Sequence, residues 1–141
     1  MAGTAVSSAE PQALERLAWS EHLGQRILRA DLRNLDREGL LALTEQYGRA
    51  LRPLPPLSVR LLVLHGSIEF HPDALTRGRG VLIEVSSRVL RSAVVGPDGM
   101  MKLAIERFFD TASLLGQDLH QRGRNFPEGD EERALTWLKE P

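Results

Sequence analysis

The sequence predicts an α/β protein with a small, mostly parallel sheet, an antiparallel hairpin at the N-terminal edge of that sheet, and about four covering helices. Strand-like apolar runs alternate with amphipathic helical stretches, as they do where helical crossovers join parallel strands. Two short extended segments flank the turn His22-Leu23-Gly24, which favours a hairpin. The chain closes with a helical pattern that places Ala134, Trp137 and Leu138 on one face. Together these observations predict a covered sheet closed by a tryptophan-bearing helix.

The first half of the chain predicts two strands, a helix and a third strand. Residues 14–19 and 27–32 form the predicted hairpin, and Asn34 or Asp36 caps the helix that follows. That helix must end before the proline-rich link, because proline cannot continue it. Residues 59–64 are a compact apolar run, typical of a central strand covered on both faces. The inward face of the helix is predicted to carry Leu40, Leu41, Leu43, Tyr47 and Leu51.

Residues 72–89 allow two interpretations. A helix can begin at Pro72, whereas Gly78 and Gly80 weaken its interior and residues 81–83 are equally compatible with extended chain. We favour the helix, because its apolar residues fall on one face. They are Leu75, Leu82, Val85 and Val89.

The remaining elements are short. Residues 93–96 predict another buried strand, and the helix that opens at Pro97 is expected to span residues 97–112. Residues 119–122 are a candidate edge strand. Asp130 is placed to cap the closing helix.

Composition indicates one globular domain. Residues 1–12 are rich in small residues without apolar periodicity, so we expect a disordered N-terminal segment ahead of a single domain over residues 13–141. Hydrophobic residues make up 42% of the chain and charged residues 26%, which is ordinary for globular proteins. The 18 basic and 19 acidic residues leave a formal net charge of -1, so nucleic acid is not an expected partner.

Several classes of chemistry are excluded or disfavoured by the sequence. The chain has no cysteine, which excludes disulfides, thiolate catalysis and sulfur-ligated zinc. Residues 1–11 lack the basic region and apolar run of a signal peptide. Every apolar run falls well short of the roughly 20 residues that span a bilayer. We therefore expect a cytoplasmic protein without a transmembrane segment and without a cofactor.

Four stretches carry a family resemblance: residues 27–31, residues 58–64, residues 92–96 with Gly99 and Lys102, and residues 134–138. Their order and spacing, over roughly residues 14–140, resemble the bacterial STAS-like proteins with the SpoIIAA-like fold. The resemblance implies a small sheet backed by helices. Anti-sigma-factor antagonists and the lipid-carrying CRAL-TRIO domains share that fold, so it constrains function only loosely.

The resemblance also implies a regulatory residue. In the antagonists a phosphorylatable Ser or Thr lies at the start of the helix after the central strand, which points to Ser67 here. A phosphoryl group on Ser67 adds roughly two negative charges beside Glu69, close to the helix that begins at Pro72. The alternative is that Ser67 is only a turn residue after Gly66. Glu69 and Asp73 are candidate partner-binding residues of the same segment.

Two further constellations have a functional and a structural interpretation. His65 and His71, with the acids beside them, are residue types suited to metal binding or general base catalysis. Their spacing matches no established ligand pattern, so histidines that are exposed or hydrogen-bonded are favoured. Residues 96–99, with Lys102, can offer backbone N–H groups to an anion at a helix start, but a tight strand-to-helix turn explains them better.

The helix over residues 97–112 has more apolar surface than one buried stripe uses. The surplus residues, which are candidates for partner or ligand binding, are Met100, Met101, Phe108 and Phe109. They can pack into the core, cover a dimer contact or line a lipid-sized pocket. A set of arginines is interpreted as a solvated basic edge that could receive an acidic partner: Arg77, Arg79, Arg88 and Arg91.

The sequence leaves two hypotheses of function. The first is a non-enzymatic regulatory or protein-interaction module that binds another protein or itself. The second is a small carrier that holds an apolar or lipid-like ligand between the sheet and the helix over residues 97–112. An enzyme is disfavoured, because the sequence nominates no catalytic residues: it shows no activated nucleophile, no carboxylate pair in a shared context and no cofactor fingerprint.

Overall fold

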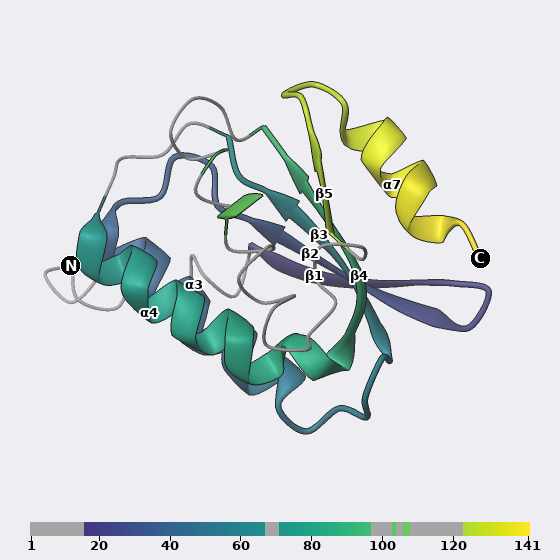
Figure 1. Cartoon of the computed structure of the whole chain (residues 1–141), viewed down its shortest axis with the longest axis horizontal. Helices are drawn as coiled ribbons and strands as arrows, with labels where there is room; N and C mark the ends of the chain where they lie inside the picture. The colour runs from purple at the N-terminus through teal and green to yellow at the C-terminus, as the bar shows by residue number, and fades with distance from the viewer. Residues whose placement is uncertain (1–15, 67–70, 97–102, 104–105, 108–122) are drawn as a thin grey trace, which may run out of the picture.

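The computed structural model describes residues 16–66, 71–96, 103, 106–107 and 123–141, which form one sheet with helices on both faces (Figure 1). The strands are β1 (Leu17–His22), β2 (Gln25–Asp31), β3 (Val59–Leu64), β4 (Val89–Val95) and β5 (Gly123–Phe126). The α-helices are α3 (Arg37–Leu51), α4 (Pro72–Val85) and α7 (Glu131–Lys139), and a 3-10 turn over Ser86–Arg88 follows α4.

The strands lie in the sheet in the order in which they occur along the chain. β1 pairs with β2 antiparallel, and every other neighbouring pair is parallel. The predicted α/β class, with a mostly parallel sheet and an antiparallel N-terminal hairpin, is therefore confirmed. The described ranges contain three α-helices rather than about four. The helix predicted over residues 97–112 lies mostly outside them, although Leu103, Glu106 and Arg107 have helical conformation.

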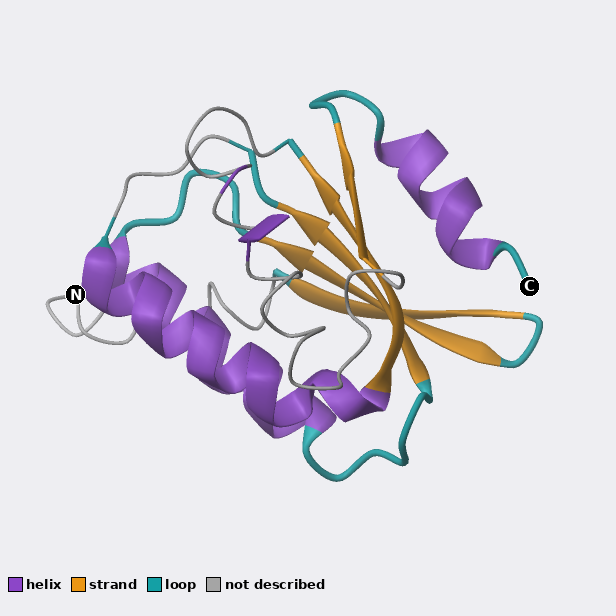
Figure 2. Ribbon diagram, viewed as in Figure 1, coloured by secondary structure: helices purple, strands orange, loops and turns teal. Residues whose placement is uncertain are grey.

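The sheet separates two apolar layers. Figure 2 shows α3 and α4 together on one face and α7 on the other. Alternate residues of β3 point to opposite faces, as a strand requires. Accordingly, Val59 and Leu61 belong to the cluster under α3 and α4, whereas Leu62 and Leu64 belong to the cluster under α7. The apolar run that predicted β3 is thus explained by coverage on both faces.

The described residues of the layer under α3 and α4 are aliphatic apart from Tyr47. Asp36 begins α3, and its side chain accepts a hydrogen bond from the backbone N–H of Gly39 at 2.7 Å. Leu51, at the end of α3, is fully buried, as is Val85 at the end of α4. Full burial of one such side chain contributes about 1.5–3 kcal/mol, so this layer supplies much of the driving force for folding.

Some predicted boundaries are wrong. β1 begins at Leu17 rather than at residue 14 and continues to His22, and β2 begins at Gln25. α4 ends at Val85, and the 3-10 turn that follows lets Val89 begin β4 instead of continuing the helix. The apolar spacing of Val89 misled the prediction, because a residue on the inner face of a strand is buried as well.

Other predicted segments are only partly described. The predicted disordered segment over residues 1–12 and the predicted edge strand over residues 119–122 lie outside the described residues. The outer strand next to β4 is β5, which directly follows the second of these ranges. Asp130 does occupy the N-cap position of α7. Its carboxylate, however, accepts from Arg133 Nη1 at 2.7 Å instead of from a helix N–H.

Candidate functional site

Most of the predicted site residues lie outside the described part of the chain. They are Ser67, Glu69, Met100, Met101, Phe108 and Phe109. Their proposed roles in regulation, partner binding or ligand binding stay predictions, and the same holds for the carrier pocket that depends on residues 97–112.

Asp73 is the one predicted binding residue that the structure describes. It lies in the first turn of α4, and its carboxylate accepts hydrogen bonds from Nε of Arg37, at 2.8 Å, and from Nη2 of the same side chain. The hydrogen bonds from Arg37 lower the pKa of Asp73. Asp73 therefore connects α4 to α3, so a partner would have to compete with Arg37 for its carboxylate.

Two more ion pairs cross between the helices. Arg77 Nε donates to Glu45 at 2.7 Å, and Arg52 Nε donates to Glu84 at 2.6 Å. The pKa of each carboxyl is lowered, first by its hydrogen bond with arginine. Such pairing accounts for the shifts without a catalytic role. Arg77, predicted to be part of a solvated basic edge, is exposed and forms its ion pair with Glu45.

The ends of β3 and β4 approach each other closely. His65 follows β3, is buried, and has its Nδ1 2.9 Å from the carbonyl oxygen of Gly66. Gly96 follows β4 with φ +93°, and a Cβ there would lie 3.0 Å from the backbone nitrogen of Gly66. Glycine is needed at this position because its backbone is left-handed and another backbone is in contact with it. Over the ranges that the structure describes, no three His, Asp or Glu residues gather as a metal site.

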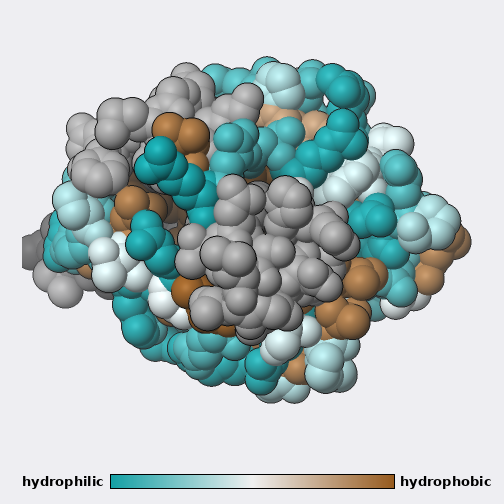
Figure 3. Space-filling view, viewed as in Figure 1, coloured by the Kyte–Doolittle hydropathy of each residue, from teal (hydrophilic) through white to brown (hydrophobic). Residues whose placement is uncertain are grey.

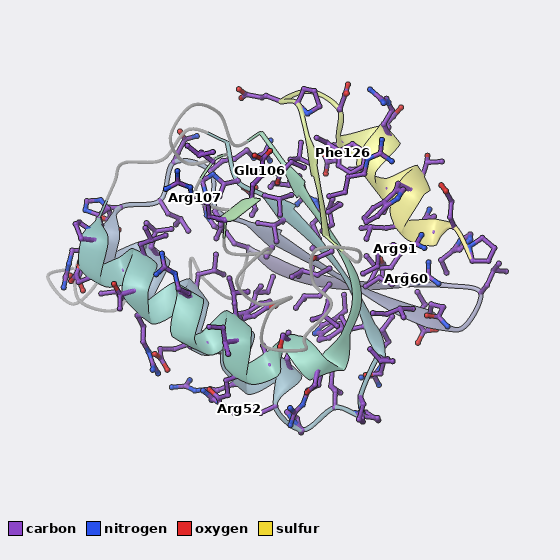
Figure 4. All side chains as sticks on the ribbon, in the orientation of Figure 1. Arg52, Arg60, Arg91, Glu106, Arg107 and Phe126 are labelled. Atoms are coloured by element: carbon purple, nitrogen blue, oxygen red, sulfur yellow. The ribbon has the colours of Figure 1, made fainter. Side chains whose placement is uncertain are left out.

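Arg60 and Arg91 form an unpredicted cationic site beneath α7. They are neighbours in the β3–β4 register, and Figure 4 shows both between the sheet and the C-terminal end of α7. Arg60 Nη1 donates to the carbonyl oxygens of Leu138 and Glu140, the latter at 2.5 Å. Arg91 Nη1 donates to the carbonyl oxygen of Trp137 at 2.8 Å. The guanidinium groups thus donate to carbonyls at the C-terminal end of α7, where Trp137 also accepts from the backbone N–H of Glu140 at 3.2 Å.

This arrangement also places positive charge at the negative end of the helix dipole. Arg60 is only 7% exposed, and its burial, followed by repulsion from Arg91, lowers its pKa. Its Nε donates to the side-chain oxygen of Gln25 at 3.3 Å. We call Arg60 and Arg91 the arginine clamp. The prediction that Arg91 lies on a solvated basic edge is wrong, because α7 covers it.

Aromatic contacts also hold α7 against the sheet. The ring of Trp137 lies 5.8 Å from that of Phe126 between centroids, and the Arg91 guanidinium carbon lies 4.9 Å from the Trp137 centroid. At the other end of the helix, Arg29 Nε donates to Glu131 at 3.0 Å. The predicted docking of the tryptophan-bearing helix is confirmed, with Ala134 and Leu138 fully buried.

The outer strand β1 presents a different surface. Trp19 is 45% exposed, and the guanidinium carbon of Arg26 lies 5.8 Å from its ring centroid. A shallow groove of about 330 Å³ lies here, lined by Trp19, Ser20, Glu21 and Arg26. An exposed tryptophan on an outer strand is a typical anchor for a protein partner, because it buries a large area with little loss of side-chain freedom.

The apolar character continues to the tip of the hairpin. Leu23 is 90% exposed between β1 and β2, and Leu57, which immediately precedes Ser58 and β3, is 51% exposed. Figure 3 shows hydrophobic atoms in brown at the end of the molecule where the hairpin projects. We call Trp19, Leu23 and Arg26, with the edge of β1 that faces away from β2, the hairpin surface.

Only part of these two regions has a signal in the sequence. An arginine inside the apolar run of residues 59–64 indicates a buried cation that needs oxygen partners, but those partners lie 78 and 80 residues further along the chain. The alternation that predicted β1 did not indicate which strand is outermost. For that reason the exposure of Trp19 was missed.

Comparison of the chain with protein-family models, curated proteins and solved structures finds no match. The structure therefore defines the protein by its fold, a small α/β domain with a mixed five-stranded sheet. The resemblance to STAS-like proteins stays a prediction. No helix within the described ranges combines the length and apolar character needed to cross a membrane.

Proposed function

We propose that this chain is a non-enzymatic protein-interaction module of the STAS-like type, and that it binds another polypeptide along the hairpin surface. The observation that carries the proposal is the outer edge of β1, with which no other strand of the described residues pairs, beside an exposed tryptophan. Edge strands present unpaired N–H and C=O groups to which an extended segment can add, and side-chain pockets give such binding its specificity. The groove at Trp19 supplies such a pocket.

The charge pattern of the domain supports binding rather than catalysis. Within the described part of the chain, the carboxyls with a lowered pKa are Asp31, Glu45, Asp73 and Glu84. Each of them accepts a hydrogen bond from an arginine side chain. Functional acids and bases are more often recognised by pKa values moved toward neutrality in a cleft.

Photo-crosslinking tests the proposal in the cell that makes the protein. Benzoyl-phenylalanine placed at Trp19 is expected to form a covalent adduct with a polypeptide after irradiation. The matched control is the same probe at Arg79, an exposed position on α4. Adducts of equal yield at both positions, or none at Trp19, would refute the hairpin surface as a binding site.

A further inference from the structure

The backbone geometry of β1 determines which groups are free for a partner. The N–H of Asp31 donates to the carbonyl of Arg16 at 2.9 Å, so these two residues form a hydrogen-bonded pair. Hydrogen-bonded and non-hydrogen-bonded pairs alternate along an antiparallel ladder. Ala18, Ser20 and His22 therefore direct their backbone groups toward β2. Leu17, Trp19 and Glu21 direct theirs outward, away from the sheet.

We infer that β1 pairs antiparallel with β1 of a second copy of this chain, with Trp19 on the twofold axis. This inference rests on the proposed function and names the partner. Trp19 is the central one of the three outward residues, so a twofold axis there pairs all of them. Leu17 then lies opposite Glu21 of the second copy, and Trp19 lies opposite its own equivalent.

The side chains on this edge are compatible with self-pairing. Trp19 and Glu21 lie on one face of the sheet, opposite Leu28 and Arg26 of β2. Two copies thus bring the exposed tryptophans side by side on one face, where each shields the other from water. Glu21 and Arg26 contribute opposite charges, and the charge of Arg16 lies 3.8 Å from Asp31. The edge is therefore close to neutral and does not repel its own copy.

The opposite edge of the sheet favours this closed arrangement over other pairings. β5 has four residues, bears Arg124, and is followed at once by Pro127, which has no N–H to donate. Short, charged or proline-limited edges resist pairing. Pairing of β1 with β5 would also generate an open chain of subunits, whereas β1 with β1 closes after two.

Single cysteines test the register, because the chain contains none of its own. Cα atoms of a hydrogen-bonded antiparallel pair lie about 5.5 Å apart, within the range that a disulfide spans. Under mild oxidation, Trp19→Cys is expected to form a covalent dimer. Leu17→Cys and Glu21→Cys alone are expected to crosslink poorly, but their mixture should give the mixed dimer. This pairing would be refuted if all three single variants crosslinked equally. It would also be refuted if neither Trp19→Cys nor the mixture of Leu17→Cys and Glu21→Cys formed a covalent dimer.

Sedimentation velocity tests the association without a crosslink. The original chain is expected to dimerise, and Trp19→Lys is expected to weaken dimerisation by about tenfold or more, because two ammonium groups then meet at the axis. Ala18→Lys lies on the opposite face of the same strand, does not meet its equivalent, and serves as the control. A monomer at every concentration would overturn the inference. A Trp19 photo-adduct with a different polypeptide would then still support the proposed function.

Discussion

The two faces of the sheet hold their helices by different means. α3 and α4 have 15 and 14 residues, pack on an aliphatic layer, and are tied to each other by surface ion pairs. α7 has nine residues and packs on a smaller layer that contains Phe126 and Trp137. Its last carbonyls are bound by the arginine clamp.

The difference shows how a short helix is kept in place. Isolated helices below about 12–15 residues are marginal in water, so α7 depends on its contacts with the sheet. Apolar burial supplies part of that stability, and the clamp supplies donors to carbonyls at the C-terminal end of the helix. Lysine has one compact charge on a flexible stem, whereas the guanidinium of Arg60 donates from two nitrogens in different directions. Its Nη1 donates to the carbonyls of Leu138 and Glu140, and its Nε donates to Gln25.

The largest expected effect is the loss of stability when one buried leucine on each face of the sheet is replaced by alanine. Leu51→Ala under α3 and Leu138→Ala on α7 each remove a fully buried side chain. We expect each to lower the free energy of unfolding by about 2–5 kcal/mol, with Leu51→Ala at the upper end because the longer helices cannot shift to fill the space. Urea unfolding in a Trp19→Phe background, with Trp137 as the single tryptophan reporter, measures both. Leu57→Ala, at an exposed position, is the control. A larger loss for Leu138→Ala would contradict the comparison.

The second prediction tests the clamp. Arg60→Met removes the donor to the carbonyl of Leu138 and one of the two donors to the carbonyl of Glu140, which keeps Arg91 Nη1 at 3.3 Å. We expect the free energy of unfolding to fall by about 1–3 kcal/mol. In this variant, amide hydrogen exchange should become faster in α7 and stay unchanged in α3, because the stabilising contact is lost on one face of the sheet only. Arg79 is an exposed residue of α4, so Arg79→Met should change neither the free energy of unfolding nor the exchange rates of α7. Unchanged or increased stability would mean that desolvation of the buried cation outweighs its hydrogen bonds.

A third, smaller effect concerns the helix pair alone. Gly80 lies inside α4, and a Cβ built there meets nothing within 4 Å. Gly80→Ala is therefore expected to raise the free energy of unfolding by about 0.5–1 kcal/mol, through helix propensity. Thermal unfolding measures the gain. The same substitution at Gly96 should destabilise, because Gly96 has φ +93° and its Cβ would meet the backbone of Gly66.

The smallest expected effect is a dependence of the free energy of unfolding on acid pH, caused by Asp31 on the α7 side of the sheet. Hydrogen bonds from Arg33 lower the pKa of Asp31 below its ordinary value of 3.8. The stabilisation is present above the unfolded-state pKa and disappears as the pH falls through the lowered folded-state pKa. Asp31→Asn should therefore reduce the slope of stability against pH below about pH 4. Urea unfolding between neutral and acid pH measures this slope, and an unchanged slope would exclude Asp31 as its source.

The sequence predicted the elements whose signals are local. The apolar run of β3 and the face of α3 that carries Leu43, Tyr47 and Leu51 are both confirmed. The boundary between α4 and β4 was missed at Val89, because burial on a helix face and burial on a strand face leave the same residue types. The polar residues Ser86–Arg88, which form the 3-10 turn, were the signal in the sequence for the break between the two elements.

The arginine clamp and the hairpin surface both depend on contacts between residues distant in sequence. Arg60 finds its carbonyl partners in α7, and that pairing is visible only once the sheet and the terminal helix are assembled. The exposure of Trp19 depends on the strand order, which makes β1 outermost. Of the residues predicted to form a site, Asp73 is described and is paired with Arg37.

The alternation of β3 has a consequence for how the domain can change over time. Each side chain of this strand packs in one of the two layers. Inserting or deleting a single residue within β3 would therefore turn the side chains that follow toward the opposite layer. Leu62 would then face the helix pair, and Arg60 would lose α7. Length variation in homologous chains should for that reason be confined to the loops, with β3 constant in length.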